Sequence, residues 1–222
     1  MISAALKALS DVLSPPFRAV LWKSLGLTVL LLVILWIVIE VVVDSLALAP
    51  WAWANTMITV ITGLGLIALA VILIAPVTAL FAGLFLDGIA ELVERKHYPN
   101  DPVGRELSTG RAIITAIQFG LLVLVINLLL LPTFLLGIGV AAALLANAYL
   151  LGREFFEMIA MRHMPVEEAR LLRRENSHRV LAAGFIPALL AIIPIVNLVV
   201  PLFSTAYMVH IYKRIVRRQA AF

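Results

Sequence analysis

The stretch Ala191–Pro201, AIIPIVNLVVP, holds two prolines and one asparagine in an otherwise apolar context. It lies within a charge-free run that extends from Val180 to Val209. Two membrane spans joined by a turn need more than about 40 residues, and this run is shorter than that. Either the run forms a single span that leaves the basic C-terminal tail outside, or it forms a re-entrant hairpin of two half-length helices.

Charge and turn chemistry favour the hairpin. Basic residues flank the run on both sides, at Arg179 and Lys213, and positive residues stay on the cytoplasmic side of a membrane. Pro194 and Asn197 suit a turn at mid-membrane depth, where non-helical backbone is tolerated only if it is buried in protein or lines a water-filled cavity. We therefore predict a re-entrant second hairpin over 180–212, with Pro194 and Asn197 at its tip as candidate pore residues.

The composition of the whole chain is that of an integral membrane protein. Of its 222 residues, 63% are hydrophobic and only 14% are charged, against roughly 45–50% and about 25% in a soluble domain. No polar linker interrupts the chain, so we expect one all-α membrane domain over 1–222. The absence of cysteine excludes disulfides and thiolate metal sites.

The distribution of the 17 Lys and Arg residues indicates a topology. These residues fall into four segments, 7–23, 95–111, 153–179 and 213–218. The long gap between the first two segments predicts two transmembrane helices, over 15–46 and 56–98, that carry the chain out and back. Trp51 and Trp53 fit an outer interfacial belt between them, and Pro76 predicts a kink in the second helix.

The next charge-free run, 112–152, is about twice as long as one helix across a bilayer. It must therefore turn back, and Pro132 with the glycines that follow it is the available turn signal. We predict a first hairpin over 112–158, with legs near 113–131 and 138–158. A cytosolic helix is expected after it, over 165–176.

The N-terminal segment 1–13 has an amphipathic pattern. Ile2, Leu6 and Leu9 recur at helical spacing, with polar residues between them. This pattern predicts a short interfacial helix that lies on the membrane surface. A frayed tail is the alternative.

Four short segments of the chain are informative as a set. They are Pro15-Pro16-Phe17-Arg18, Ala75-Pro76-Val77, Leu151-Gly152-Arg153-Glu154-Phe155-Phe156-Glu157 and Ile193-Pro194-Ile195-Val196-Asn197. In this order, and with the elements around them, the chain resembles the CysZ family of bacterial sulfate permeases over nearly its whole length. The resemblance implies two long transmembrane helices, two hairpins that only partly penetrate the bilayer, and a homo-oligomer. It also implies a multi-pass protein of the bacterial inner membrane that imports sulfate for cysteine synthesis.

The resemblance further implies a sulfate site at the start of the first long helix, where the family has a Pro-Gly-Leu/Ile-Arg-Arg-type stretch. In this chain Pro16 stands at the glycine position and Ala19 at that of the second arginine, so only Arg18 is kept. A helix N-terminus offers free N–H groups and partial positive charge, and an arginine fork binds an oxyanion through two parallel bonds. We predict Phe17, Arg18 and Ala19 as the sulfate-binding residues. The alternative is that Arg18 only reaches lipid phosphate.

The remaining charged residues give weaker evidence for a functional site. Arg153 and Glu157 lie one helical turn apart, which indicates an exposed ion pair at the membrane edge; a gate or an oligomer contact is the alternative. The histidines lack metal-ligand spacing, and no nucleophile or phosphate-binding motif occurs, so we expect no metal, no cofactor and no enzymatic activity. The expected partners are sulfate or a related oxyanion, the lipid bilayer and further copies of the chain, but no nucleic acid. The alternative function is that of a membrane scaffold that transports nothing.

Overall fold

The computed structural model describes residues 1–45, 51–106, 114, 118, 121, 122, 125, 126, 128–130, 132, 133 and 135–219. Every regular element in this part of the chain is a helix, in agreement with the predicted all-α class. The chain divides into two compact units. The long-helix unit comprises residues 18–85, and the core unit comprises residues 1–17 and 86–222.

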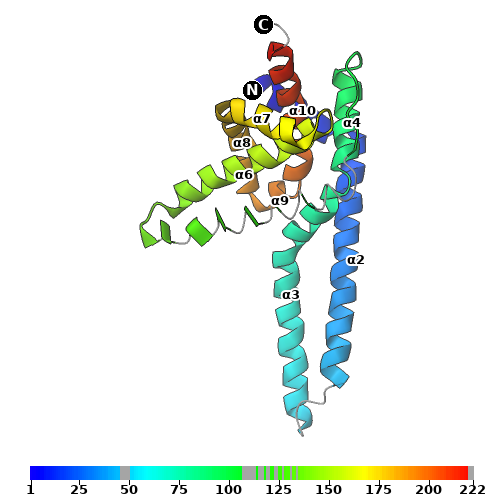
Figure 1. The fold of residues 1–222 in the computed structure, drawn as a ribbon. Helices are drawn as coiled ribbons and strands as arrows, with labels where there is room; N and C mark the ends of the chain where they lie inside the picture. Colours follow the sequence, from blue (N-terminus) through cyan, green and yellow to red (C-terminus); the bar gives the residue numbers. More distant parts are fainter. Residues whose placement is uncertain are drawn as a thin grey trace. The chain divides into compact units, whose positions relative to one another are not determined.

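The long-helix unit consists of two antiparallel helices (Figure 1). The first, α2, spans Pro15–Ser45 and begins at a proline pair, which fits the first turn of a helix because its N–H groups have no partner there. The second, α3, spans Ala52–Gly83. The buried hydroxyl of Thr78 donates a hydrogen bond of 3.0 Å to the buried hydroxyl of Thr28, so a polar contact joins the two helices.

Most of the surface of α2 and α3 is apolar and exposed. Pro15–Val43 and Trp53–Val71 are long and apolar enough to cross a membrane, and almost none of their residues are buried within the protein. Burial of apolar surface is favourable by roughly 25 cal/mol per Å², so a continuous apolar surface of this length indicates contact with lipid. The two predicted transmembrane helices therefore correspond to two candidate membrane spans.

The second predicted helix is in fact two helices. We expected one helix over 56–98, but α3 ends at Gly83, and α4 spans Leu86–His97 after a turn. The reason is a change in the distribution of apolar residues. Whereas α3 is apolar on all sides, α4 is amphipathic, buries one face in the core unit and exposes charged residues on the other. Pro76 lies in the C-terminal part of α3, where Figure 1 shows the helix axis bending.

The central helix of the core unit is α10, Val200–Gln219. All of its residues from Leu202 to Lys213 are buried. It contacts α4 and several further helices, among them α1 (Ile2–Val12), α6 (Gly139–Met161) and α8 (Ser177–Ala191). Another helix, α7 (Val166–Glu175), lies against α6 at the place of the predicted cytosolic helix.

The last three helices form a helical hairpin. The short helix α9, Pro194–Asn197, separates α8 from α10, so the chain turns where the sequence places the turn. Ile193 is extended, and Pro194 then opens α9 at a position where no N–H is required. The helical hairpin is thus present, with Pro194 and Asn197 between its legs.

The first hairpin is described only in part. Its second leg is α6, which begins at Gly139, close to the predicted start at residue 138. The first leg, predicted over 113–131, lies in large part outside the described residues. The turn before α6 contains Gly137 at φ +74°, a backbone conformation in which a side chain would be strained.

The helices α6 and α8 pack closely through small residues. A Cβ atom added to Gly184 would lie 1.9 Å from the carbonyl oxygen of Ala148, and one added to Gly152 would lie 2.7 Å from that of Val180. Small residues one turn apart allow two helix backbones to approach in this way. Only glycine fits at these two positions.

The N-terminal helix α1 buries small residues and exposes large ones. Ala4 and Ala8 are buried, and the helix packs on α10. Ile2, Leu6 and Leu9 are 75%, 63% and 49% exposed. The predicted helix therefore forms, and its large apolar side chains are left outside the core.

Candidate functional site

The core unit contains a strongly basic cavity of about 330 Å³ between α1 and α10. Five cationic side chains line it: Lys7, Lys213, Arg214, Arg217 and Arg218. They converge because the last two turns of α10 carry basic residues at positions 213, 214, 217 and 218, and α1 places Lys7 opposite them. Ser3 on α1 accepts a hydrogen bond of 3.1 Å from Arg214.

Two of the five cations are held by Asp101 and Tyr98. Lys213 and Arg217 each lie 3.3 Å from the Asp101 carboxylate. The same two cations lie over the ring of Tyr98, at 5.8 and 5.1 Å from its centroid. Within the described part of the chain, neither Lys7 nor Arg218 is paired with a carboxylate. The cavity therefore has an excess of positive charge.

Titratable groups around the cavity respond to this charge. Burial alone would raise the pKa of Asp101, but the charges and hydrogen bonds of Lys213 and Arg217 outweigh it and hold that pKa below its usual value. Burial and the charges of Arg214 and Arg218 lower the pKa of the Met1 amino group. Burial and the neighbouring His97 lower the pKa of His210, which also lines the cavity, to about 4. His210 is therefore neutral at pH 7 and adds no positive charge.

A second cavity, of about 220 Å³, extends the basic region. Met1, Arg179, Arg214 and Arg218 are among its lining residues. Because Arg214 and Arg218 line both cavities, the two spaces present one cationic surface. Such a surface attracts anions and raises their local concentration.

The predicted sulfate residues lie in the first turn of α2. Phe17 is 3% exposed and packs in the core unit, whereas Arg18 and Ala19 are exposed. Arg18 forms no ion pair with any other residue that the structure describes. The exposed guanidinium is thus compatible with either of the two roles predicted for it, an oxyanion ligand or a lipid contact.

Arg153 and Glu157 form the predicted ion pair, at 3.3 Å, but it is not an exposed one. Glu157 is only 5% exposed, because α7 covers it. Arg173 of α7 donates to the same Glu157 oxygen at 2.5 Å, and Arg170 lies 3.9 Å from the other oxygen. The arrangement joins α6 to α7, and a gate or an oligomer contact at Arg153 and Glu157 stays a prediction.

A second buried ion network joins α4 to the end of α6. Glu94 is 1% exposed and accepts hydrogen bonds from His163 at 2.9 Å and from the Gly104 N–H at 3.0 Å. Arg162 lies 3.5 Å from Glu94 and is also bonded to Asp87. Burial alone would raise the pKa of Glu94, but these partners outweigh it and lower that pKa.

Sequence reasoning did not find the cavity, because its parts are far apart in the chain. The basic tail was visible as a cluster, but only tertiary packing brings Lys7, Tyr98 and Asp101 to it. The alternation of small and large residues in α1 was a signal that could have placed Lys7 near another helix. Pro194 and Asn197 lie in α9, in the turn of the second hairpin.

The long-helix unit has two exposed apolar helices of membrane-spanning length, and the core unit is helical in its described residues and holds a cationic cavity. These features are those of a helical membrane protein. A family model described as sulfate transporter CysZ/etoposide-induced protein 2.4 matches residues 4–201. The match covers most of the chain, so the protein belongs to this family, and the resemblance seen in the sequence is confirmed. The family is of a transporter type rather than an enzymatic one. No curated protein sequence matches the chain.

Proposed function

We propose that this protein is a sulfate permease of the bacterial inner membrane, which supplies sulfate for cysteine synthesis. The observation that carries the proposal is the basic cavity, in which five cationic side chains face one space and Asp101 pairs with only two of them. Membership of the sulfate transporter family supports the choice of substrate.

Sulfate is a strongly hydrated dianion at neutral pH, so a binding site must replace its water with several donors at once. Arginine forks provide parallel charge-assisted bonds that match a tetrahedral oxyanion. A permeant ion must also leave, so weak binding suits a channel. We expect an affinity near the millimolar range, or about −4 kcal/mol.

Arg18, with its neighbours Phe17 and Ala19, is a second proposed oxyanion site, at the start of α2, and these residues do not line the basic cavity. Pro15 and Pro16 have no N–H, so Phe17 carries the first N–H of the helix, whereas the N–H groups of Arg18 and Ala19 bond to carbonyls one turn earlier. The guanidinium of Arg18 is therefore the main donor of this proposed site. Ala19 in place of a second arginine leaves a single guanidinium there, which is consistent with weak binding.

The same proposal includes a topology. We infer that α2 and α3 cross the bilayer, with the stacked and exposed Trp51 and Trp53 at the outer surface. The exposed Ile2, Leu6 and Leu9 of α1 are inferred to lie in the inner interface.

Both hairpins are inferred to be re-entrant, because basic residues stand at both ends of each. A homo-oligomer that surrounds the hairpin tips would bury exposed apolar residues such as Ile195, which is 80% exposed. We infer that further copies of the chain are the partners at this surface.

Sulfate flux into proteoliposomes of the purified protein tests the function. Arg18→Ala removes charge-assisted bonds worth roughly 1.5–3 kcal/mol, so flux at low sulfate should fall by about one to two decades. Arg18→Lys should keep only part of the flux, because an ammonium has no fork. Arg218→Ala removes a cation that lines the basic cavity, so it should also lower the sulfate flux. Arg95→Ala is the matched control, because it removes an exposed arginine that is paired only with Glu91 of the same helix among the described residues.

Each outcome separates the alternatives. If Arg18→Ala has the flux of the wild type, Arg18 is not part of the sulfate-binding site. If Arg218→Ala has the flux of the wild type, the basic cavity is not part of the sulfate pathway. Flux of the wild type no greater than that of empty vesicles would refute the permease and favour a membrane scaffold.

A further inference from the structure

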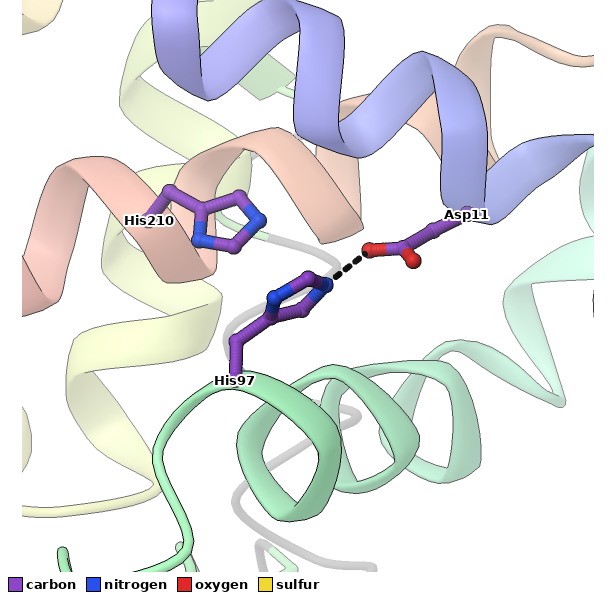
Figure 2. A group of neighbouring side chains, drawn as sticks. All are labelled: Asp11, His97 and His210. Atoms are coloured by element: carbon purple, nitrogen blue, oxygen red, sulfur yellow. Dashed lines mark hydrogen bonds and ion pairs between the residues drawn. The ribbon is translucent and has the colours of Figure 1, made fainter.

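Three side chains from distant parts of the chain converge in the core unit. Asp11 comes from the end of α1, His97 from the end of α4 and His210 from α10 (Figure 2). One ligand atom from each lies within 4.8 Å of the other two. His97 Nε2 and Asp11 Oδ2 are 2.8 Å apart, and the two imidazole rings meet edge to face with centroids 4.9 Å apart.

His210 has a nitrogen with no protein partner. The side chain is 3% exposed, and its Nδ1 is 2.8 Å from the hydroxyl of Tyr98. Its Nε2 is buried and has no hydrogen-bond partner in the described part of the chain. Figure 2 shows this ring turned toward the Asp11 carboxylate and His97. A buried nitrogen without a partner is unfavourable, and its lone pair points into a space that an imidazole and a carboxylate also face.

We propose that Asp11, His97 and His210 form a binding site for a divalent transition-metal ion of the Zn²⁺ type. Imidazole and carboxylate ligands suit zinc and its neighbours, and three protein ligands leave a further position for water. Tetrahedral ligands at ~2.0–2.1 Å from zinc lie about 3.3 Å from one another. Binding therefore draws the farthest pair together by at most about 1.5 Å from the 4.8 Å limit, which side-chain rotation can supply.

Two of the three proposed ligands, His210 and Asp11, already have an outer partner that would orient them. Tyr98 can accept a hydrogen bond from Nδ1–H of His210, which leaves Nε2 free for the metal. Lys96 Nζ holds the second oxygen of Asp11 at 2.6 Å, so Oδ2 stays directed at His97. The metal would displace the proton shared by His97 and Asp11, because metal binding requires deprotonated ligands.

A bound ion would link three helices of the core unit. The ligands belong to α1, α4 and α10, so a bound ion would fix the N-terminal helix to the core beside the basic cavity that His210 lines. Lys7 and Lys96 lie nearby and oppose a further cation, so the affinity should be moderate. The inference does not depend on sulfate transport.

The test uses the purified full chain with a tag that contains no histidine. Zn²⁺ is added, excess ion is removed by gel filtration, and bound metal and the unfolding temperature are measured. We expect one Zn²⁺ per chain and a higher unfolding temperature, both lost in His97→Gln and His210→Gln. His178→Gln, which replaces an exposed histidine of α8, is the control and should behave as the wild type. Added Co²⁺ should give the visible absorption of a four-coordinate site in the wild type and in His178→Gln, but not in His97→Gln or His210→Gln.

Several results would overturn the proposal. They are a wild-type protein that retains no Zn²⁺, equal binding by the two glutamine variants, and loss of binding in the control. If His210→Gln does not fold, Asp11→Asn replaces it, because the amide has the shape of the carboxylate without its charge. Retention of one Zn²⁺ by Asp11→Asn with unchanged affinity would also contradict the site.

Discussion

Gly184→Ala is the substitution that the packing of α6 and α8 makes most informative. The added Cβ would lie 1.9 Å from the carbonyl oxygen of Ala148 and 2.9 Å from the backbone nitrogen of Gly152. Ordinary carbon–oxygen contacts begin near 3.3 Å, so the helices must separate by roughly 1.4 Å at this point. The opposing atoms are backbone atoms of a helix, and they cannot rotate away as a side chain would.

The cost of that separation follows from close packing. A gap of 0.5–1 Å already forfeits about a quarter to a half of each dispersion contact along the interface. Overpacking typically costs about 1–3 kcal/mol, and we expect roughly 3 kcal/mol because neither backbone can yield. For a chain of this size the unfolding temperature should fall by roughly 6–12 °C.

The assay is thermal unfolding of the purified protein in detergent, followed by circular dichroism. Gly88→Ala on α4 is the matched control, because no atom lies within 4 Å of a Cβ added there. It should leave stability unchanged or raise it by up to about 1 kcal/mol, since alanine is the better helix former. A second substitution, Ala148→Gly, should not rescue Gly184→Ala, because the clash is with the main chain. Unfolding of Gly184→Ala within about 2 °C of the wild type would refute the close approach of the two helices.

Three further predictions concern charges and topology. Glu94→Gln removes one of the two carboxylates that pair with the buried Arg162, and Asp87 remains, so it should cost about 1.5–3 kcal/mol. Glu91→Gln, at a side chain that is 41% exposed, should cost less than about 1 kcal/mol in the same denaturant unfolding. The pKa of Glu94 is lowered in the folded state, so its ionised form stabilises the fold fully above the pKa of about 4.3 that it has in the unfolded chain. This stabilisation is lost as the pH falls through the folded-state pKa, so the wild type and Glu94→Gln should converge in stability in acid. A difference in stability that does not change with pH would contradict this assignment. Asp101→Asn removes a carboxylate that neutralises two cavity cations and should tighten oxyanion binding in equilibrium titration, whereas weaker binding would count against the cavity. In the cysteine-free chain, Ser177→Cys and Arg218→Cys, both exposed, should react with an impermeant thiol reagent from the same side of a membrane of fixed orientation, and labelling from opposite sides would exclude the re-entrant hairpin.

The sequence by itself determined the features that depend on local chemistry. The length of the apolar segments and the distribution of Lys and Arg predicted two long helices, and the candidate membrane spans of the structure lie in α2 and α3. The proline pair at 15 and 16 marked the start of α2, and Pro194 marked the turn between α8 and α10. Each of these signals acts through the residue's own backbone or through the solvation of a continuous segment, so it can be read without knowledge of the fold.

Tertiary structure alone decided the features that depend on partners far along the chain. The break between α3 and α4 arises because α4 has one face buried in the core unit, and Glu157 is buried because α7 packs over it. The metal-site proposal needs side chains at positions 11, 97 and 210, whose spacing in sequence carries no signal. Such features are set by which helix faces meet, and that outcome depends on the packing of the whole core rather than on any single segment.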